Sequence, residues 1–267
     1  MKIGPSISLT TLTLTAFLAD QARGGTKLST LRRRVAAITY AHEAAGYEPP
    51  QGRLVKSVLQ GIARTHGAAR QQKAAVTATR LQQMLRHCPK TLRGLRDRAL
   101  LLLGFAGALR RSELVALTVA DLEDVEEGLR IHIRRSKTDQ EGIGHVVPVL
   151  NGPRFKVAEA VQDWLAAAQI TEGPVFRPLA KGGKVLPVAL STRSVAEIVK
   201  TYAEQAGLDP AQFAGHSLRA GFLTSAAEAG ASIFKMMEVS RHRSVETVKK
   251  YVRTAELFKD HAGVSFL

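Results

Sequence analysis

The sequence predicts a mainly α-helical protein with one small antiparallel β-sheet, an α+β chain built from two domains. Apolar residues recur at helical spacing through most of the 267 residues, whereas one segment near the middle alternates apolar and polar side chains. A polar, basic and glycine-containing stretch at 66–75 separates two helical regions and is the best linker candidate in the chain. These observations predict a small helical domain over residues 1–70 and a larger domain over residues 76–267.

The first domain is expected to contain three helices. Residues 8–22 form the first helix, the second begins with Ser29 as its N-cap and runs up to Gly46, and the third covers 53–64. The apolar positions that share one side of each helix are Leu9, Leu12 and Phe17 in the first, Leu31, Val35 and Ile38 in the second, and Leu54, Val58 and Ile62 in the third. This spacing predicts three short amphipathic helices packed around a small core.

The second domain is expected to be helical apart from one hairpin. Helical patterns cover residues 77–88, 91–107, 153–168, 191–206, 217–229, 232–239 and 245–256. The apolar helix at 91–107 is too short to cross a membrane, so it is expected to be buried. Alternating residues at 129–134, a charged turn at 135–144 and a second strand from His145 to Leu150 predict a β-hairpin with a charged tip.

The charge of the chain points to a polyanionic partner. Lys and Arg number 38 against 23 Asp and Glu, which leaves a net charge of +15 and a pI near 10.4. Residues 1–80 hold 12 basic and 3 acidic residues (net +9), and residues 81–267 hold 26 and 20 (net +6). Nucleic acid is the commonest large polyanion, so the N-terminal third is expected to grip DNA.

Several function classes receive no support from the sequence. Cys88 is the single cysteine, which excludes a disulfide framework, and no cysteine–histidine spacing matches a zinc site. The sequence holds no P-loop, no signal-peptide pattern and no apolar run of about 18 residues. A protein of the cytoplasm and its nucleoid, with no membrane partner, is therefore expected.

Two arginine-containing motifs could bind an anion. Arg110 and Arg111 lie at a turn before Ser112 and Glu113, at the start of a helix whose dipole favours anions, so a bound anion would explain them. His216 and Arg219 are three residues apart and share a helix face. Arginine binds phosphate oxygens with two parallel N–H groups, and histidine exchanges protons near neutral pH. Each motif alone also fits an ordinary surface helix.

Three further residues complete a set. Tyr251 follows His242 by nine residues on a basic helix, and Lys137 lies at the tip of the predicted hairpin. A tyrosine on such a helix usually packs against its neighbours, and a hairpin lysine is usually a solvated charge. Their meaning therefore depends on the whole set.

In this order and spacing the motifs resemble the tyrosine site-specific recombinase, or phage integrase, family. The resemblance covers residues 75–256 as the catalytic domain and, more loosely, 8–66 as the helical core-binding domain. The six matching residues are Arg110, Lys137, His216, Arg219, His242 and Tyr251. Arg111 replaces the small or apolar residue usual in the family, so either arginine could point into the site, although the following Ser-Glu-Leu favours Arg110.

The resemblance implies a metal-free and ATP-free reaction without any cofactor. Tyr251 would attack the scissile phosphodiester and form a 3′-phosphotyrosyl link, with His216 as general base. Arg110 and Arg219 would hold the non-bridging oxygens, and Lys137 would protonate the leaving 5′ oxygen. His242 would hydrogen-bond the phosphate and help to place Tyr251.

The family also implies partners. Double-stranded DNA would lie in a clamp formed by the two domains, with a monomer binding first and a homotetramer joining two DNA sites. Accessory DNA-bending proteins could take part. The candidate phosphate contacts are Arg32, Arg33, Arg34 and Lys56. The core-binding domain is expected to lack the family's first helix, and Leu257 and Phe258 would dock on a neighbour or on their own subunit.

Two other classes of protein remain as alternatives. A type IB topoisomerase uses similar chemistry to relax DNA, and a decayed integrase could persist as a non-catalytic DNA-binding protein. The core-binding region favours the recombinase over the topoisomerase. The intact set of six side chains argues against the decayed form.

Overall fold

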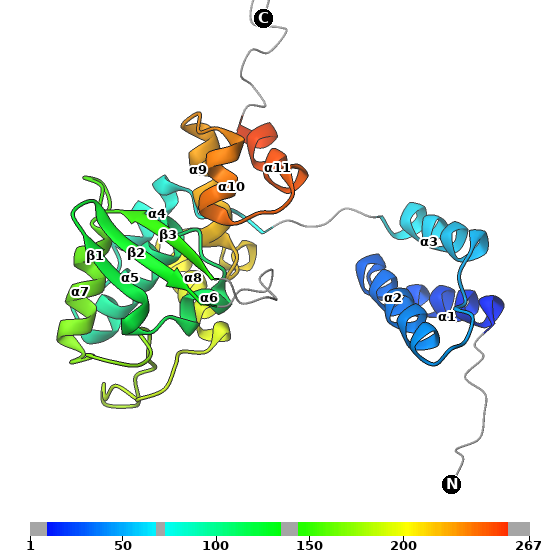
Figure 1. Cartoon of the computed structure of the whole chain (residues 1–267), viewed down its shortest axis with the longest axis horizontal. Helices are drawn as coiled ribbons and strands as arrows, with labels where there is room; N and C mark the ends of the chain where they lie inside the picture. Colours follow the sequence, from blue (N-terminus) through cyan, green and yellow to red (C-terminus); the bar gives the residue numbers. More distant parts are fainter. Residues whose placement is uncertain (1–9, 68–72, 135–143, 256–267) are drawn as a thin grey trace, which may run out of the picture. The chain divides into compact units, whose positions relative to one another are not determined.

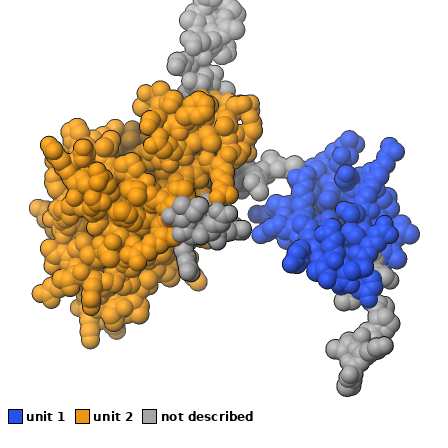
Figure 2. Space-filling model, viewed as in Figure 1, with its two compact units in different colours: residues 1–72 blue, residues 73–267 orange. Residues whose placement is uncertain are grey.

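Two compact units, residues 1–72 and 73–267, make up the chain in the computed structural model (Figures 1 and 2). The structure describes residues 10–67, 73–134 and 144–255. In these ranges no helix combines the length and apolar character needed to cross a membrane. The mainly helical fold with a small antiparallel sheet confirms the predicted fold class.

Unit 1 consists of three helices, α1 (Thr11–Arg23), α2 (Leu28–Ala44) and α3 (Arg53–His66). The Thr10 side chain caps α1 by accepting a hydrogen bond of 3.1 Å from the backbone N–H of Thr13. The buried residues that form the core of the unit are Leu14, Leu18, Ala22, Leu28, Leu31, Val55 and Ile62. Three short helices thus bury one small apolar cluster.

Of the expected core positions, those in α2 are confirmed, and so are Val58 and Ile62 in α3, whereas Leu12 and Leu54 were wrong. Leu12 is 71% exposed and Leu54 is 45% exposed, whereas Leu14 and Val55 are buried. Each of these helices carries apolar residues on more than one side, so spacing alone left the buried side open. The expected N-cap was also wrong, because Lys27 precedes α2 without a side-chain cap and Ser29 lies in its first turn.

Unit 2 contains a three-stranded antiparallel sheet in the order β1 (Leu122–Val125), β2 (Gly128–Ile133) and β3 (His145–Leu150). Ile131 lies opposite Leu122 in β1 and Val147 in β3. The expected hairpin is present, and its charged tip, including Lys137, lies outside the described residues. β1 was missed because it is four residues long, half of them acidic.

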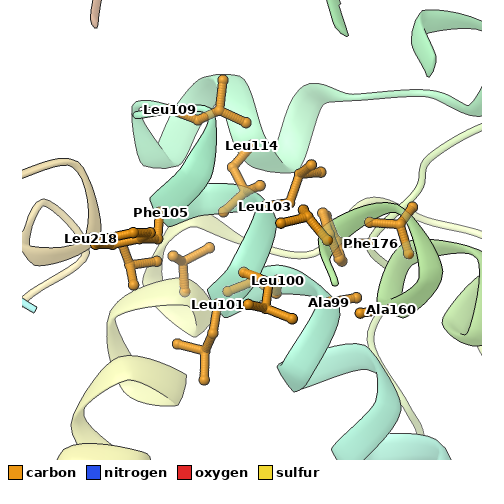
Figure 3. Close-up of a cluster of buried hydrophobic side chains, with 14 of the residues drawn as sticks. Ala99, Leu100, Leu101, Leu103, Phe105, Leu109, Leu114, Ala160, Phe176 and Leu218 are labelled. Carbon is orange, nitrogen blue, oxygen red and sulfur yellow. The ribbon is translucent and has the colours of Figure 1, made fainter. Parts of the chain in front are cut away.

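The main core of unit 2 surrounds the apolar helix α5 (Leu92–Ala106). Helix α7 (Val157–Ala167) packs along α5, and both helices contact strands of the sheet (Figure 1). Figure 3 shows Leu103, Leu114 and Leu218 converging on this core from three different helices. The buried Trp164 donates its Nε1–H to the Val175 carbonyl oxygen at 2.8 Å, so its one polar group is satisfied.

The remaining helical segments are α4 (Ala78–Leu85), α6 (Arg111–Ala116), η1 (Val119–Asp121), α8 (Thr192–Gln205), η2 (Pro210–Gln212), α9 (Ser217–Glu228), α10 (Ile233–Ser240) and α11 (Val245–Ala255). Helices α9, α10 and α11 pack on one another around a second apolar cluster that includes Leu223, Met236, Val248 and Tyr251 (Figure 1). The helices that carry Arg219 and Tyr251 therefore meet in one part of unit 2, next to the segment after α10 that carries His242.

A backbone segment at the start of unit 2 lies directly on α9. The N–H of Val76 donates to the Ser217 carbonyl oxygen at 2.9 Å, and the N–H of Ala74 donates to the Gln212 carbonyl oxygen at 2.7 Å. Gly221 permits this contact, since a Cβ there would lie 1.7 Å from the Val76 carbonyl oxygen. The helix that carries Arg219 is thus fixed from its outer side by this segment.

Candidate active site

Arg110 stands at the start of α6 and is held by the carboxylate of Glu113. Its side-chain NH1 donates to Glu113 Oε1 at 2.6 Å, and its backbone N–H donates to Glu113 Oε2 at 2.8 Å. The Glu113 side chain is only 2% exposed. An arginine at a helix N-terminus opposes the helix dipole, and here an internal carboxylate supplies the anion that this position calls for.

Arg111 lies beside the same turn but is exposed. Its stem packs close to Gly215, where an added Cβ would lie 3.0 Å from Arg111 Cδ. Its charge acts on His216. Of these two arginines, Arg110 forms an ion pair with the buried Glu113, and the exposed Arg111 adds positive charge at the edge of the site.

Arg219, from the first turn of α9, is 1% exposed and crosses the centre of the site. Its NH1 donates to the Ala108 carbonyl oxygen at 2.6 Å, and its NH2 donates to the Ser240 carbonyl oxygen. NH2 also lies 3.3 Å from Nε2 of His242. Burial and neighbouring positive charges lower the pKa of Arg219, yet arginine starts so high that it stays protonated at neutral pH.

His242 follows α10 and is held in one orientation by Ser240. The Ser240 hydroxyl donates to the Met236 carbonyl oxygen at 2.5 Å, so at its 2.8 Å contact it accepts from Nδ1–H of His242. This assignment leaves Nε2 as an acceptor. Burial and the charges of Arg219 and Arg110 lower the pKa of His242 to about 4, so the ring is neutral at pH 7.

His216 occupies the N-cap position of α9 and is open to solvent. The protein around its ring, followed by the charges of Arg219, Arg110 and Arg111, lowers its pKa below the ordinary 6.5. The ring is therefore mostly neutral at pH 7. A neutral imidazole beside three cations can accept a proton.

Tyr251 on α11 is 8% exposed and packs in the apolar cluster of α9, α10 and α11. Burial raises the pKa of its phenol, and the charge of Arg219 acts in the opposite direction. Within the described parts of the chain its hydroxyl has no hydrogen-bond partner. A buried phenol with a raised pKa is protonated at pH 7, so it needs a base before it can act as a nucleophile.

The structure therefore brings five of the six predicted catalytic residues into one site in unit 2, and the sixth, Lys137, lies outside the described residues. Electrostatic effects connect the five, since the charge of Arg219 acts on His216, His242 and Tyr251, and the charge of Arg110 acts on Arg219 and both histidines. The described side chains offer no cluster of three His, Cys, Asp or Glu that could hold a metal ion. The expectation of a metal-free reaction stays a prediction.

The four predicted DNA contacts lie in unit 1 and differ in exposure. Arg32, Arg33 and Lys56 are exposed, whereas Arg34 is half-buried. Arg34 donates to the side-chain oxygen of Gln21, and its guanidinium lies 5.9 Å from the centre of the Phe17 ring. Arg34 therefore stabilises the packing of α1 on α2 and is the least available of the four.

Two residues of the site were missed as functional candidates. From the sequence, Glu113 was used only to decide between Arg110 and Arg111 as the site residue. A glutamate at the third position of a helix is nevertheless a known capping signal. Arg241 gave no local signal. Its NH2 donates to Glu113 Oε2 at 2.6 Å across 128 residues of sequence.

Comparisons with known proteins identify the family of the chain. The model of the phage integrase family matches residues 75–257. The chain is 39% identical over 252 residues to an integrase/recombinase XerD homolog of Selenomonas ruminantium, and this alignment covers 92% of the chain and 73% of the relative. It is 31% identical to the tyrosine recombinase XerC of Syntrophus aciditrophicus (strain SB) over 61% of the chain and 50% of that relative, so it spans about half the length of that relative.

Solved structures show the same fold at low sequence identity. The XerH site-specific recombinase bound to palindromic difH substrate, a post-cleavage complex, superposes with a TM-score of 0.69 at 18% identity and covers 94% of this chain and 70% of its own. The Tn1549 transposon integrase in complex with transposon right-end DNA gives 0.67 at 15% identity, with 95% and 86% covered. The family match and the XerD-like relative together settle the resemblance: the chain belongs to the phage integrase family of tyrosine recombinases, enzymes that cut and rejoin DNA strands.

Proposed function

We propose that the chain is a site-specific recombinase of double-stranded DNA in which Tyr251 is the nucleophile. The phenol gives its proton to neutral His216, and its oxygen attacks the scissile phosphorus. The bond to the 5′ oxygen breaks, that oxygen takes a proton from Lys137, and the DNA 3′ end remains joined to Tyr251. A free 5′ hydroxyl of another strand then reverses the same step and restores the phosphodiester.

The observation that carries this proposal is the gathering of Arg110, Arg219, two neutral histidines and a buried phenol in one site. Guanidinium groups fixed before DNA arrives stabilise charge on phosphate oxygens without further rearrangement. The lowered pKa values of His216 and His242 keep both rings neutral beside these cations. One neutral ring can accept the phenol proton, and a nearby phosphate would favour protonation of His242 Nε2, which could then donate to it.

The two units would divide the work. Unit 2 carries the catalytic site, and unit 1 would hold DNA through Arg32, Arg33 and Lys56, which are exposed on α2 and α3. Such contacts go to phosphates and set affinity more than sequence preference. Synapsis of two DNA sites would require four copies of the chain, assembled from monomers on nucleoid DNA in the cytoplasm, with DNA-bending proteins as possible helpers.

Trapping of a covalent complex tests the nucleophile. The protein is incubated with a duplex nicked close to the cleavage position, so that the short 5′ fragment diffuses away and the 3′-phosphotyrosyl product accumulates. The native protein should give a slowly migrating complex that resists boiling in detergent, and Tyr251→Phe should give none. Tyr47→Phe, which removes another phenol outside the site, should trap as well as the native protein.

The same assay separates the alternatives. Equal trapping by Tyr251→Phe would reject Tyr251, and no trapping by the native protein on any member of a library of inverted-repeat duplexes would favour a non-catalytic DNA-binding protein. Relaxation of a supercoiled plasmid that lacks a recombination site would favour a topoisomerase.

A further inference from the structure

Arg241 is an unusual residue for the end of a helix. It occupies the C-cap position of α10 in the left-handed conformation, with φ 56° and ψ 41°. Glycine is favoured there because a Cβ crowds the backbone. The guanidinium of Arg241 is nevertheless buried, and its Nε–H has no partner among the described residues.

Stability of the fold does not explain this choice. A left-handed backbone, a buried charge and an unpaired donor each cost free energy. Strained residues of this kind persist where the surrounding structure uses them, so the contacts of the side chain indicate what the residue does.

The contacts of Arg241 lead to Arg110. Its NH2 donates to Glu113 Oε2 at 2.6 Å, and NH1 donates to its neighbour, the Val239 carbonyl oxygen, at 2.9 Å. NH1 also reaches the Gly107 carbonyl oxygen at 3.5 Å. Arg241 thus joins the end of α10 to the turn and helix start that carry Arg110.

Glu113 is the shared link in this chain of contacts. Its Oε1 accepts from the Arg110 side chain, while its Oε2 accepts from both Arg110 N–H and Arg241. With Arg241 in place, the carboxylate is fixed by two cations, the half-buried Arg110 and the buried Arg241. Without it, the carboxylate would keep only its two bonds to Arg110, so no contact through Glu113 would tie Arg110 to the end of α10.

We propose that Arg241 is a positioning residue for DNA cleavage, which acts through Glu113 to hold Arg110 at a fixed place relative to His242. The proposal rests on the function proposed above for Arg110. Arg241 itself touches no phosphate, since its NH1 and NH2 are engaged by protein acceptors. A planar guanidinium is needed to reach the carboxylate and the two carbonyl groups together, and a lysine ammonium cannot span them in the same way.

Two substitutions at Arg241 test this role. Arg241→Gly suits the left-handed backbone, so it removes the side chain and relieves the strain at once, and Arg241→Lys keeps the charge. Both should lower the single-turnover rate of covalent complex formation at saturating DNA by about 100-fold, the loss typical of a misplaced catalytic group. DNA affinity should change by less than about threefold, because no DNA contact is removed. Arg193→Lys, in an exposed pair with Glu197, should leave both unchanged.

A double-mutant cycle distinguishes positioning from general damage. If Arg241 acts through Arg110, then Arg241→Lys should cost less than about threefold in a protein that already carries Arg110→Ala, because the interaction has been removed. Thermal unfolding of each variant is recorded in parallel. Additive losses, a native cleavage rate in Arg241→Gly, or failure of both single variants to fold would each overturn the proposal.

Failure of the proposed function would look different. The reference in every comparison is a covalent complex that Tyr251→Phe abolishes. If that complex does not form in the native protein, the recombinase chemistry fails. If it forms and the Arg241 variants form it equally fast, only the positioning role fails.

Discussion

The pH dependence of strand cleavage should show whether His216 takes the proton from Tyr251. Burial raises the pKa of Tyr251 above its ordinary value near 10, so at pH 7 fewer than about one in a thousand of these phenols is ionised. The surrounding protein and three arginines lower the pKa of His216 below 6.5, so at pH 7 at least about three quarters of the rings are neutral. At pH 7, therefore, most His216 rings are in the neutral form that a general base needs, whereas nearly all Tyr251 phenols are still protonated.

The cleavage rate should depend on pH differently if His216 acts as the base than if free phenolate attacks. If neutral His216 accepts the proton, a rise from pH 7 to pH 8.5 can increase the rate by at most about 1.3-fold, because most of the base is already active. If free phenolate attacked without a base, the rate would rise about tenfold for each pH unit, or about 30-fold over the same interval. Below the lowered pKa of His216 the base-assisted rate should fall.

Single-turnover cleavage of the nicked duplex from pH 5 to pH 9 measures this difference at constant ionic strength. The native protein should give a nearly flat profile above pH 7, and His216→Gln should be slow at pH 7 and recover steeply as the pH rises. His87→Gln, an exposed histidine at the end of α4, should follow the native profile. A native rate that climbs about 30-fold between pH 7 and 8.5 would refute the role of His216.

Three further predictions concern stability and DNA binding. The pKa of His242 falls from 6.5 to about 4 on folding, so this residue should not reduce the free energy of unfolding above pH 6.5. As the pH falls towards 4, the free energy of unfolding should drop by on the order of 3 kcal/mol. Urea unfolding of His242→Asn should show a smaller loss over the same pH range. Gly221→Ala should cost about 3 kcal/mol, because its Cβ would meet the Val76 carbonyl oxygen, whereas Gly152→Ala, with no atom within 4 Å, should be nearly neutral in the same unfolding experiment. Replacing Arg32, Arg33 and Lys56 with Gln should weaken non-specific duplex binding and reduce the slope of log affinity against log salt by about 0.9 for each lost phosphate contact, and unchanged slopes would remove unit 1 from the DNA interface.

The helices of unit 2 could be predicted closely because their local signals agree. The apolar run expected at 91–107 is α5 (Leu92–Ala106), and Thr91 caps it by accepting from the N–H of Gly94. In unit 1 the helices were predicted, and so was the buried side of α2, but Leu12 in α1 and Leu54 in α3 were wrongly assigned to the core. Short helices with apolar residues on several sides obtain their orientation from packing, which a local pattern does not contain.

The candidate site was predictable only as far as its residues form short motifs. The resemblance of the ordered set of motifs to the family selected His216, Arg219, His242 and Tyr251, but it gave no sign that Arg219 would be buried among backbone carbonyl groups. The pair Glu113–Arg241 depends on a contact across the fold. No periodicity or motif reports such a contact, so it required the structure.

The positive charge gathered at the site supports the proposal that it binds a phosphate. Arg110, Arg219 and Arg241 face one buried carboxylate, Glu113, so the group carries a net charge of +2 before DNA binds. Backbone carbonyl oxygens satisfy donors of two of these cations but cannot neutralise them. A phosphodiester would bring the missing negative charge, so the energy spent on burial before DNA arrives would favour its binding.

The backbone at the site is also energetically unfavourable at two residues. Among the described residues, three that are not glycine have positive φ, and two of them, Ala108 and Arg241, lie where the buried arginines join α5 and α10 to the start of α6. Residues with a strained backbone are typical of functional sites, where the surrounding structure holds them in place. Burial, followed by the charges of the neighbouring arginines, holds the pKa values of His216 and His242 low, so both histidines are mostly neutral at pH 7. In the proposed function, phosphate binding and proton transfer would thus depend on one arrangement of charges, and a substitution that loosens it should impair both.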